Sequence, residues 1–204
     1  MTARLAALLI AAVIAGPGGA PAGERPAEPG SYRMEDYRAP VPATLAGARV
    51  LTTAEAQALW REKAAVFVDV LPHVPKPAGL PAGTVWRDPP RRKLPGSIWL
   101  PDTGTGRLAA GTDACFRRAL DGLIHGDQAR TLVFYCQAEC WMSWNAAKRA
   151  LGYGYRNVAW YPDGSDGWEK AGLALQQGEP LARSENERQV GRARRALEFF
   201  YSSR

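Results

Sequence analysis

Short apolar runs and amphipathic segments alternate along most of the chain. Nearly continuous apolar or β-branched runs, typical of strands buried on both faces, occur at residues 65–70, 97–101, 131–136 and 157–161. Segments with an apolar face at helical spacing occur at residues 52–64, 112–125 and 141–152, and a glycine-rich turn enters a short helix within 162–173. This alternation predicts an α/β fold, a parallel sheet flanked by helices on both faces.

Other parts of the chain lack this alternation. Residues 1–22 combine a positive start, an apolar run and an Ala-Pro-Ala exit, which is typical of a secretory signal peptide. Residues 23–50 are rich in Pro, Gly and Ala and predict an extended N-terminal arm. The proline-rich stretch 71–96 predicts a long irregular surface loop. The folded domain is therefore expected at residues 51–178, followed by a C-terminal helical tail at 179–204.

Composition and charge narrow the class of protein. The hydrophobic fraction of 46% is that of a soluble globular protein, and 204 residues suffice for one domain with a hydrophobic core. The net charge of +6 comes without a basic stripe interleaved with aromatic residues, so nucleic-acid binding is not expected. The apolar run of the leader is too short for a comfortable membrane span, so no stable span is expected once the signal is removed.

Export matters most for the three cysteines, Cys115, Cys136 and Cys140, because all three would reach an oxidising compartment. An odd number means that one thiol stays free, that a pair cycles between thiols and disulfide, or that a metal or a persulfide occupies them. The plain alternative for Cys136 and Cys140 is a permanent disulfide that braces their loop. Cys115, on an apolar helix face, is expected to be a packed small side chain.

The position of Cys136 indicates a reactive residue. It ends the strongest predicted strand and stands just before the helix predicted at 141–152. Ligands in open α/β sheets bind at such strand ends, and loop N–H groups together with the positive end of a helix stabilise an anionic sulfur. The predicted anion cradle consists of Gln137, Ala138, Glu139, Cys140 and Trp141. The pattern therefore predicts a nucleophilic Cys136.

The order of these motifs resembles the rhodanese-like domain. The first strand ends in Asp69, Pro95-Gly96 precedes the next strand, and Cys136 ends a third. The run "GYRNVAWYPDGSDGW" then leads through a glycine-rich turn to a Trp. The resemblance covers roughly residues 50 to 175. It implies a rhodanese-like sheet in which Cys136 is the active residue.

A narrower resemblance lies in "CQAECWMSWNAAKRAL" together with "WYPDGSDGW". These stretches resemble exported proteins named for a CXXCW motif and associated with alcohol catabolism dependent on pyrroloquinoline quinone (PQQ). This resemblance implies a periplasmic protein with a redox or cofactor-binding role. The implied partners are PQQ-dependent dehydrogenases or their electron-transfer and accessory proteins.

The loop departs from ordinary rhodaneses at two positions. Rhodanese loops commonly have Gly three residues after the cysteine and Arg five residues after it, whereas this chain has Glu139 and Trp141. An indole replaces a cation and a carboxylate is added, so a second anion at the site is disfavoured. Thiosulfate is therefore not the expected sulfur donor.

Two kinds of function fit the cysteine pair. In the first, Cys136 attacks and Cys140 resolves, either in thiol–disulfide exchange or in sulfur transfer through a persulfide on Cys136. In the second, the chain is a non-catalytic accessory protein that binds copper or another redox cofactor, with Cys136, Cys140 and His73 as the copper ligands. The residues expected to shape the pocket are Asp69, Trp141 and Trp144. The basic residues of the proline-rich loop, Arg91, Arg92 and Lys93, are expected to be solvated.

Overall fold

The computed structural model describes residues 25–74, 77–86 and 89–181. The predicted signal peptide and residues 182–204 of the predicted C-terminal helical tail lie outside the described residues. Within the described part of the chain, no helix is long and apolar enough to cross a membrane.

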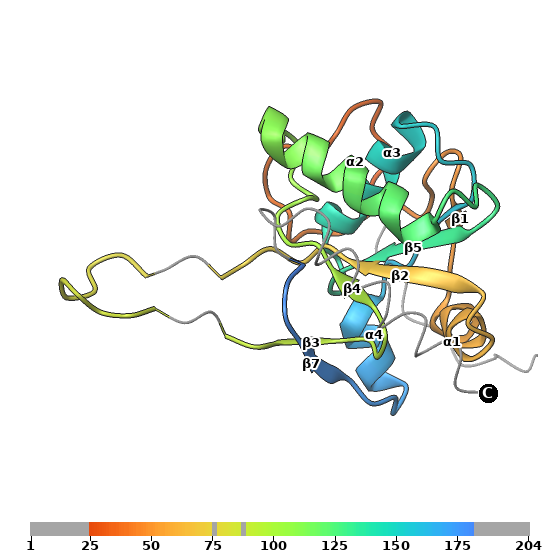
Figure 1. Ribbon diagram of the computed structural model, residues 1–204. Helices are drawn as coiled ribbons and strands as arrows, with labels where there is room; N and C mark the ends of the chain where they lie inside the picture. The colour runs from red at the N-terminus through yellow and green to blue at the C-terminus, as the bar shows by residue number, and fades with distance from the viewer. Residues whose placement is uncertain (1–24, 75–76, 87–88, 182–204) are drawn as a thin grey trace, which may run out of the picture.

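A five-stranded parallel sheet forms the centre of the domain, in the order β1-β6-β5-β2-β4 (Figure 1). Its strands are β1 (Arg49–Val50), β2 (Ala65–Asp69), β4 (Ile98–Trp99), β5 (Thr131–Tyr135) and β6 (Val158–Trp160). β5 lies in the middle, paired with β2 on one side and β6 on the other. All five residues of β2 are buried, as its β-branched run predicts.

Helices cover both faces of the sheet (Figure 1). α2 (Ala110–Ile124) and α3 (Trp141–Gly152) lie on one face, and α1 (Thr53–Arg61) and α4 (Gly164–Lys170) lie on the other. Each face has its own apolar core, and successive residues of β5 alternate between the two. The predicted α/β architecture with a parallel sheet is therefore confirmed.

A second, two-stranded sheet corrects the expectation for the proline-rich loop. β3 (Arg91–Lys93) pairs in antiparallel fashion with β7 (Gln176–Gly178). Because side chains alternate along a strand, Arg91 and Lys93 point into the domain, where they are 7% and 6% exposed, while Arg92 points to solvent. The expectation that all three are solvated is wrong for Arg91 and Lys93. Residues 77–86 of the loop project away from the domain (Figure 1).

Lys93 is a buried lysine with a lowered pKa. Its ammonium donates to the carbonyl of Ser97, and its stem packs against Gly178, where an added Cβ would collide with it. Burial lowers the pKa of Lys93 to about 8, although the nearby Asp69 carboxylate favours the charged form. The folded domain therefore begins to release this proton well below the pH at which an ordinary lysine does so.

We expect the free energy of unfolding to increase between about pH 8 and 9.5, because the unfolded chain then holds a Lys93 proton that the folded chain has released. Replacing Lys93 by Met should remove this increase. Replacing the exposed Lys170 by Met should leave it in place. Urea unfolding at a series of pH values measures the effect, and a Lys93→Met protein with the full increase would contradict it.

Candidate functional site

The two loop cysteines lie together between β5 and α3. Cys136 follows the last residue of β5, and Cys140 caps the first turn of α3. They are 0% and 3% exposed, and both are thiols. The Cys136 sulfur lies 3.5 Å from the Cys140 carbonyl oxygen and 3.6 Å from the Gln137 carbonyl oxygen. The structure therefore brings the predicted pair into contact.

The two thiols differ in pKa. Burial raises the pKa of Cys136 well above its ordinary value, and the neighbouring Cys140 raises it further. The hydrogen bond from Cys136 lowers the pKa of Cys140 to about 7, in opposition to burial. The backbone at Met142 and Gln137 and the positive charge of Arg38 act in the same direction. In the reduced pair the proton therefore resides on Cys136 and the negative charge on Cys140.

The loop backbone differs from the predicted anion cradle. The N–H of Ala138 donates to the Asp166 carboxylate at 3.3 Å, and the N–H of Trp141 donates to the Tyr37 carbonyl at 2.9 Å. The Cys136 thiol donates to the carbonyl oxygens of Gln137 and Cys140. The hydroxyl and backbone of Ser143 act in the opposite direction and favour the thiolate, but burial is the largest effect and favours the protonated form. The loop in this conformation supports a protonated Cys136.

Glu139 occupies a backbone position that suits glycine. Its φ of 49° lies in the left-handed region, and its side chain is exposed. A glycine would adopt this backbone without strain. Glu139 is therefore accommodated at some cost in backbone strain, with its carboxylate in solvent.

A buried ion pair supports the loop from the opposite face of the sheet. Nε of Arg91 donates to Asp69 at 2.7 Å, and its Nη2 donates to the Cys136 carbonyl at 3.2 Å. The same carbonyl accepts the backbone N–H of Ser165 at 2.9 Å and its hydroxyl at 3.2 Å. Gly164, at φ +54°, allows this approach, because a Cβ there would lie 2.6 Å from the carbonyl oxygen. Asp69 thus acts on the loop through Arg91.

Sequence reasoning missed Arg91 and Ser165 as parts of this site. The one available signal was Asp69, a carboxylate at the end of a fully buried strand, which requires a buried cation. In a strand, side chains alternate between the two faces, so Arg91 and Lys93 would point to one face and Arg92 to the other. The proline residues on either side favoured the prediction of an irregular loop over that of a strand.

The two tryptophans predicted to shape the pocket hold an N-terminal arm. Residues 25–48 form this arm, which contacts α3. The indole N–H groups of Trp141 and Trp144 donate to the carbonyls of Pro40 and Thr44, each at 3.1 Å. Their rings pack edge to face with centroids 5.5 Å apart. Both indoles are buried, at 3% and 0% exposure, beneath the arm.

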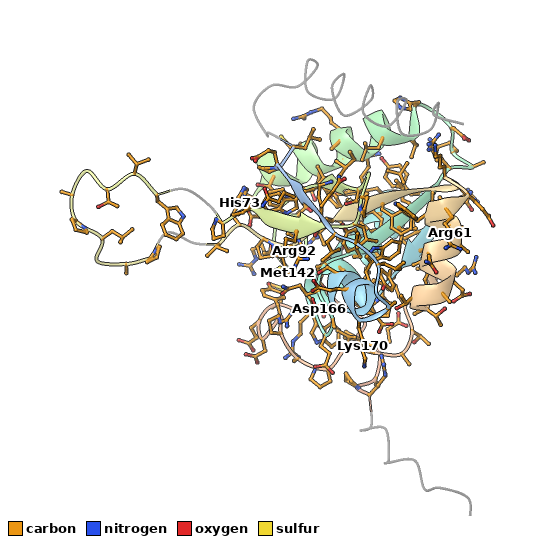
Figure 2. All side chains as sticks on the ribbon, turned by 90° about the horizontal axis from the view of Figure 1, so that it is seen from below. Arg61, His73, Arg92, Met142, Asp166 and Lys170 are labelled. Carbon is orange, nitrogen blue, oxygen red and sulfur yellow. The ribbon has the colours of Figure 1, made fainter. Side chains whose placement is uncertain are left out.

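An open pocket of about 430 Å³ lies on the α4 side of the loop. Its polar lining comes from Thr53, Asp163, Asp166 and Lys170, and Ala138 is its contribution from the loop. Asp166 and Lys170 lie near each other on this side of the molecule (Figure 2). Neither cysteine is among the lining residues, so this pocket does not itself give access to the sulfurs.

His73 lies at the base of the projecting loop (Figure 2). Its Nδ1 is 3.0 Å from the Asp102 carboxylate, and its ring contacts that of Trp99. Among the described residues, no three side chains of Cys, His, Asp or Glu are grouped as metal ligands. The expected copper ligand set, with His73 beside Cys136 and Cys140, is therefore not assembled.

Cys115 lies on α2, outside the loop that carries the pair. Its side chain is half-buried, and the Arg118 guanidinium donates to its sulfur at 3.1 Å. It is thus less deeply packed than its apolar helix face predicted.

Comparison with known proteins identifies the fold family. Residues 52–171 match the rhodanese-like domain. A thiosulfate sulfurtransferase from Pseudomonas aeruginosa is similar in structure, with a TM-score of 0.45 and 20% identity over 73% of this chain. The match spans 25% of that sulfurtransferase.

A second similar structure is a protein of unknown function from Rhodopseudomonas palustris, described as a possible tyrosine phosphatase. Its TM-score is 0.42, with 25% identity over 63% of this chain and 85% of that one. A search of curated proteins found no match. The domain match covers more than half of the chain, from the capping residue of α1 to the end of α4, and includes the cysteine loop. The chain therefore belongs to the rhodanese-like domain family.

Proposed function

We propose that Cys136 and Cys140 form a redox-active dithiol that exchanges with a disulfide. The observation that carries this proposal is that two buried free thiols meet where β5 ends and α3 begins, with the Cys136 sulfur 3.5 Å from the Cys140 carbonyl oxygen. The pair is also unequal, because Cys136 lowers the pKa of Cys140 to about 7 while burial raises the pKa of Cys136. A thiol with a pKa near the ambient pH combines a large thiolate fraction with good nucleophilicity. The second thiol lies within reach to complete the exchange.

In the proposed reaction the Cys140 thiolate attacks one sulfur of a substrate disulfide. The substrate S–S bond breaks, and the departing sulfur leaves as a thiolate that takes up a proton. Cys136 then loses its proton and attacks the Cys140 sulfur of the mixed disulfide, which releases the second substrate sulfur as a thiolate. A Cys136–Cys140 disulfide forms, and two electrons pass from the pair to the substrate.

This order of attack reverses the roles expected from the sequence, in which Cys136 attacks and Cys140 resolves. The carbonyl oxygens around Cys136 and its complete burial favour the protonated form. The helix start at Cys140 and the nearby Arg38 favour the thiolate. Both cysteines remain catalytic residues in this proposal.

Sulfur transfer through a persulfide is the second candidate, and the family match favours it. A persulfide requires anion-stabilising donors at the sulfur. Two of the five predicted cradle N–H groups, those of Ala138 and Trp141, are bonded to other acceptors. Dithiol exchange is therefore the leading proposal.

The proposed setting is the periplasm. The leader pattern of residues 1–22 supports export, and an exported dithiol meets disulfides as natural reaction partners. The resemblance of the Cys-Trp loop to PQQ-associated proteins supports a partner among PQQ-dependent dehydrogenases or their electron-transfer and accessory proteins. Co-purification with such a dehydrogenase from a native extract tests this partner directly.

The chemistry is tested by offering the reduced protein two reagents in parallel, a peptide disulfide and thiosulfate. We expect thiol release from the disulfide with formation of a Cys136–Cys140 linkage, and no persulfide from thiosulfate. Mass analysis of proteolytic fragments identifies the product. A persulfide on either cysteine, without disulfide exchange, would replace the redox proposal by sulfur transfer.

A further inference from the structure

The N-terminal arm contacts the cysteine loop through its backbone. Arg38 forms an isolated antiparallel β-bridge with Cys140, and the Tyr37 carbonyl accepts the N–H of Trp141 at 2.9 Å. Beside this bridge, the Arg38 guanidinium donates to the Gln137 side chain at 2.8 Å. A short extended stretch of polypeptide is therefore seated on the loop, directly over one of the two reacting residues.

Both ends of this stretch are fixed to the domain. On the N-terminal side, Asn145 of α3 accepts the N–H of Arg33 at 2.9 Å and donates to its carbonyl at 2.8 Å. Asn145 is itself fully buried. On the C-terminal side, Val41 and Leu45 are buried in the core beneath α3. These anchors hold the arm in register on the loop.

The stretch between the anchors lies at the surface and is held mainly by hydrogen bonds, among them those from Trp141 to the carbonyls of Tyr37 and Pro40. Every residue from 34 to 40 is exposed or half-buried. Asp36 has a left-handed φ of 46°, a strained conformation for a residue other than glycine. Segments with few buried apolar contacts open at the lowest free-energy cost in a folded protein. Residues 34–40 can therefore leave the loop while Val41 and Leu45 stay in place.

The loop groups that bind the arm indicate which kind of ligand could bind in its place. The loop presents the N–H of Trp141 and the strand edge at Cys140, and these bind the carbonyl and the extended backbone of the arm. A polypeptide strand satisfies both groups, because strand addition bonds through main-chain atoms. A small anion lacks the extended backbone, and the exposed Glu139 carboxylate adds negative charge at the same loop.

We propose that residues 34–40 form a displaceable cover over the Cys136–Cys140 pair, and that an extended polypeptide segment carrying the reacting disulfide takes the place of Tyr37 and Arg38. The choice of substrate rests on the proposed dithiol function, whereas the cover itself does not. In the closed state the pair is buried. When the cover opens, Cys140 becomes accessible to the substrate disulfide.

The test compares wild type with Tyr37→Ala/Arg38→Ala, which removes the Tyr37 hydroxyl bond to Gly106 and the Arg38 bond to Gln137. Glu35→Ala is the matched control on the same arm, because Glu35 is exposed. All three are made with Cys115→Ser. The readouts are the limiting rate of Cys140 alkylation by a bulky maleimide and the rates of exchange with two thionitrobenzoate mixed disulfides, one with a short peptide and one with a small alkyl thiol. The limiting alkylation rate is taken from a pH series, because loss of Arg38 also raises the pKa of Cys140. Thermal unfolding shows whether each variant is folded.

We expect the double variant to be alkylated about tenfold faster than wild type and the control to be unchanged, because loss of two hydrogen bonds favours opening. We expect the rate of exchange of the double variant, relative to wild type, to increase more with the peptide disulfide than with the alkyl disulfide. Equal alkylation rates in folded wild type and double variant would overturn the cover. Equal gains with the two disulfides would overturn the polypeptide substrate. Faster alkylation without exchange by any variant would retain the cover and reject the proposed dithiol function.

Discussion

Replacing Arg91 by Met is expected to lower the free energy of unfolding by about 3–5 kcal/mol at pH 7, because it leaves a buried charge without its partner. Asp69 is fully buried and its carboxylate accepts from Arg91 Nε at 2.7 Å. Burial raises the pKa of Asp69, and Arg91 is the main group that opposes this rise. Without Arg91 the carboxyl would be held protonated or would remain as an unpaired charge.

The pH dependence follows from the same pair. A buried acid whose folded pKa lies above its unfolded pKa loses stability as the pH rises between the two values. The deficit of Arg91→Met should therefore be smaller near pH 4 than at pH 7. Urea unfolding at the two pH values measures the difference.

Arg92 provides a matched control one residue along the same strand. It forms an exposed ion pair with Glu169 at 2.8 Å, and Arg92→Met should cost no more than about 1 kcal/mol. Equal losses in the two variants would contradict the assignment of Arg91 as the buried support of the loop. A smaller loss for Arg91 than for Arg92 would contradict it as well.

Replacing Cys140 by Ser is expected to lower the rate of alkylation of the pair at pH 7 at least about tenfold, in a Cys115→Ser background. The remaining Cys136 is buried among carbonyl oxygens, and its pKa is raised well above the ordinary thiol value. The rate of iodoacetamide alkylation as a function of pH gives both the rate and the apparent pKa. In wild type the apparent pKa should be about 7.

Two substitutions at Cys136 separate its role as a donor from its role as a nucleophile. Cys136→Ser keeps a hydrogen-bond donor near the Cys140 sulfur, so the low pKa of Cys140 should persist. Cys136→Ala removes the donor, so the pKa of Cys140 should rise. If Cys140→Ser kept the fast neutral-pH reaction and Cys136→Ser lost it, the roles would be those expected from the sequence.

The central sheet could be predicted because its signals are local. The β-branched run of β2 and the apolar run of β5 need no partner to be recognised, and both strands lie where the sequence placed them. The amphipathic segment at residues 52–64 likewise shows its helical spacing within a few residues, and α1 lies inside it. The order of the motifs then specified the family, and with it the position of Cys136 at the end of a strand.

The supports of the cysteine loop could not be predicted because they depend on distant pairings. β3 is formed only by its pairing with β7, where Arg91 lies opposite Gly178. Neither strand has an apolar alternation that would reveal it. The arm is placed by the side chains of Asn145, Trp141 and Trp144, which bond to backbone groups about a hundred residues earlier in the chain. A glycine-rich, proline-rich arm carries no periodic pattern that predicts such contacts.

The most direct test of the account is a redox titration of the Cys115→Ser protein in glutathione buffers, read by intact mass and by mapping of proteolytic fragments. The account predicts an intramolecular Cys136–Cys140 disulfide that forms and is reduced reversibly as the ratio of oxidised to reduced glutathione changes. A linkage that resists dithiol reductant in the folded protein, or two thiols that never join under oxidising conditions, would contradict it.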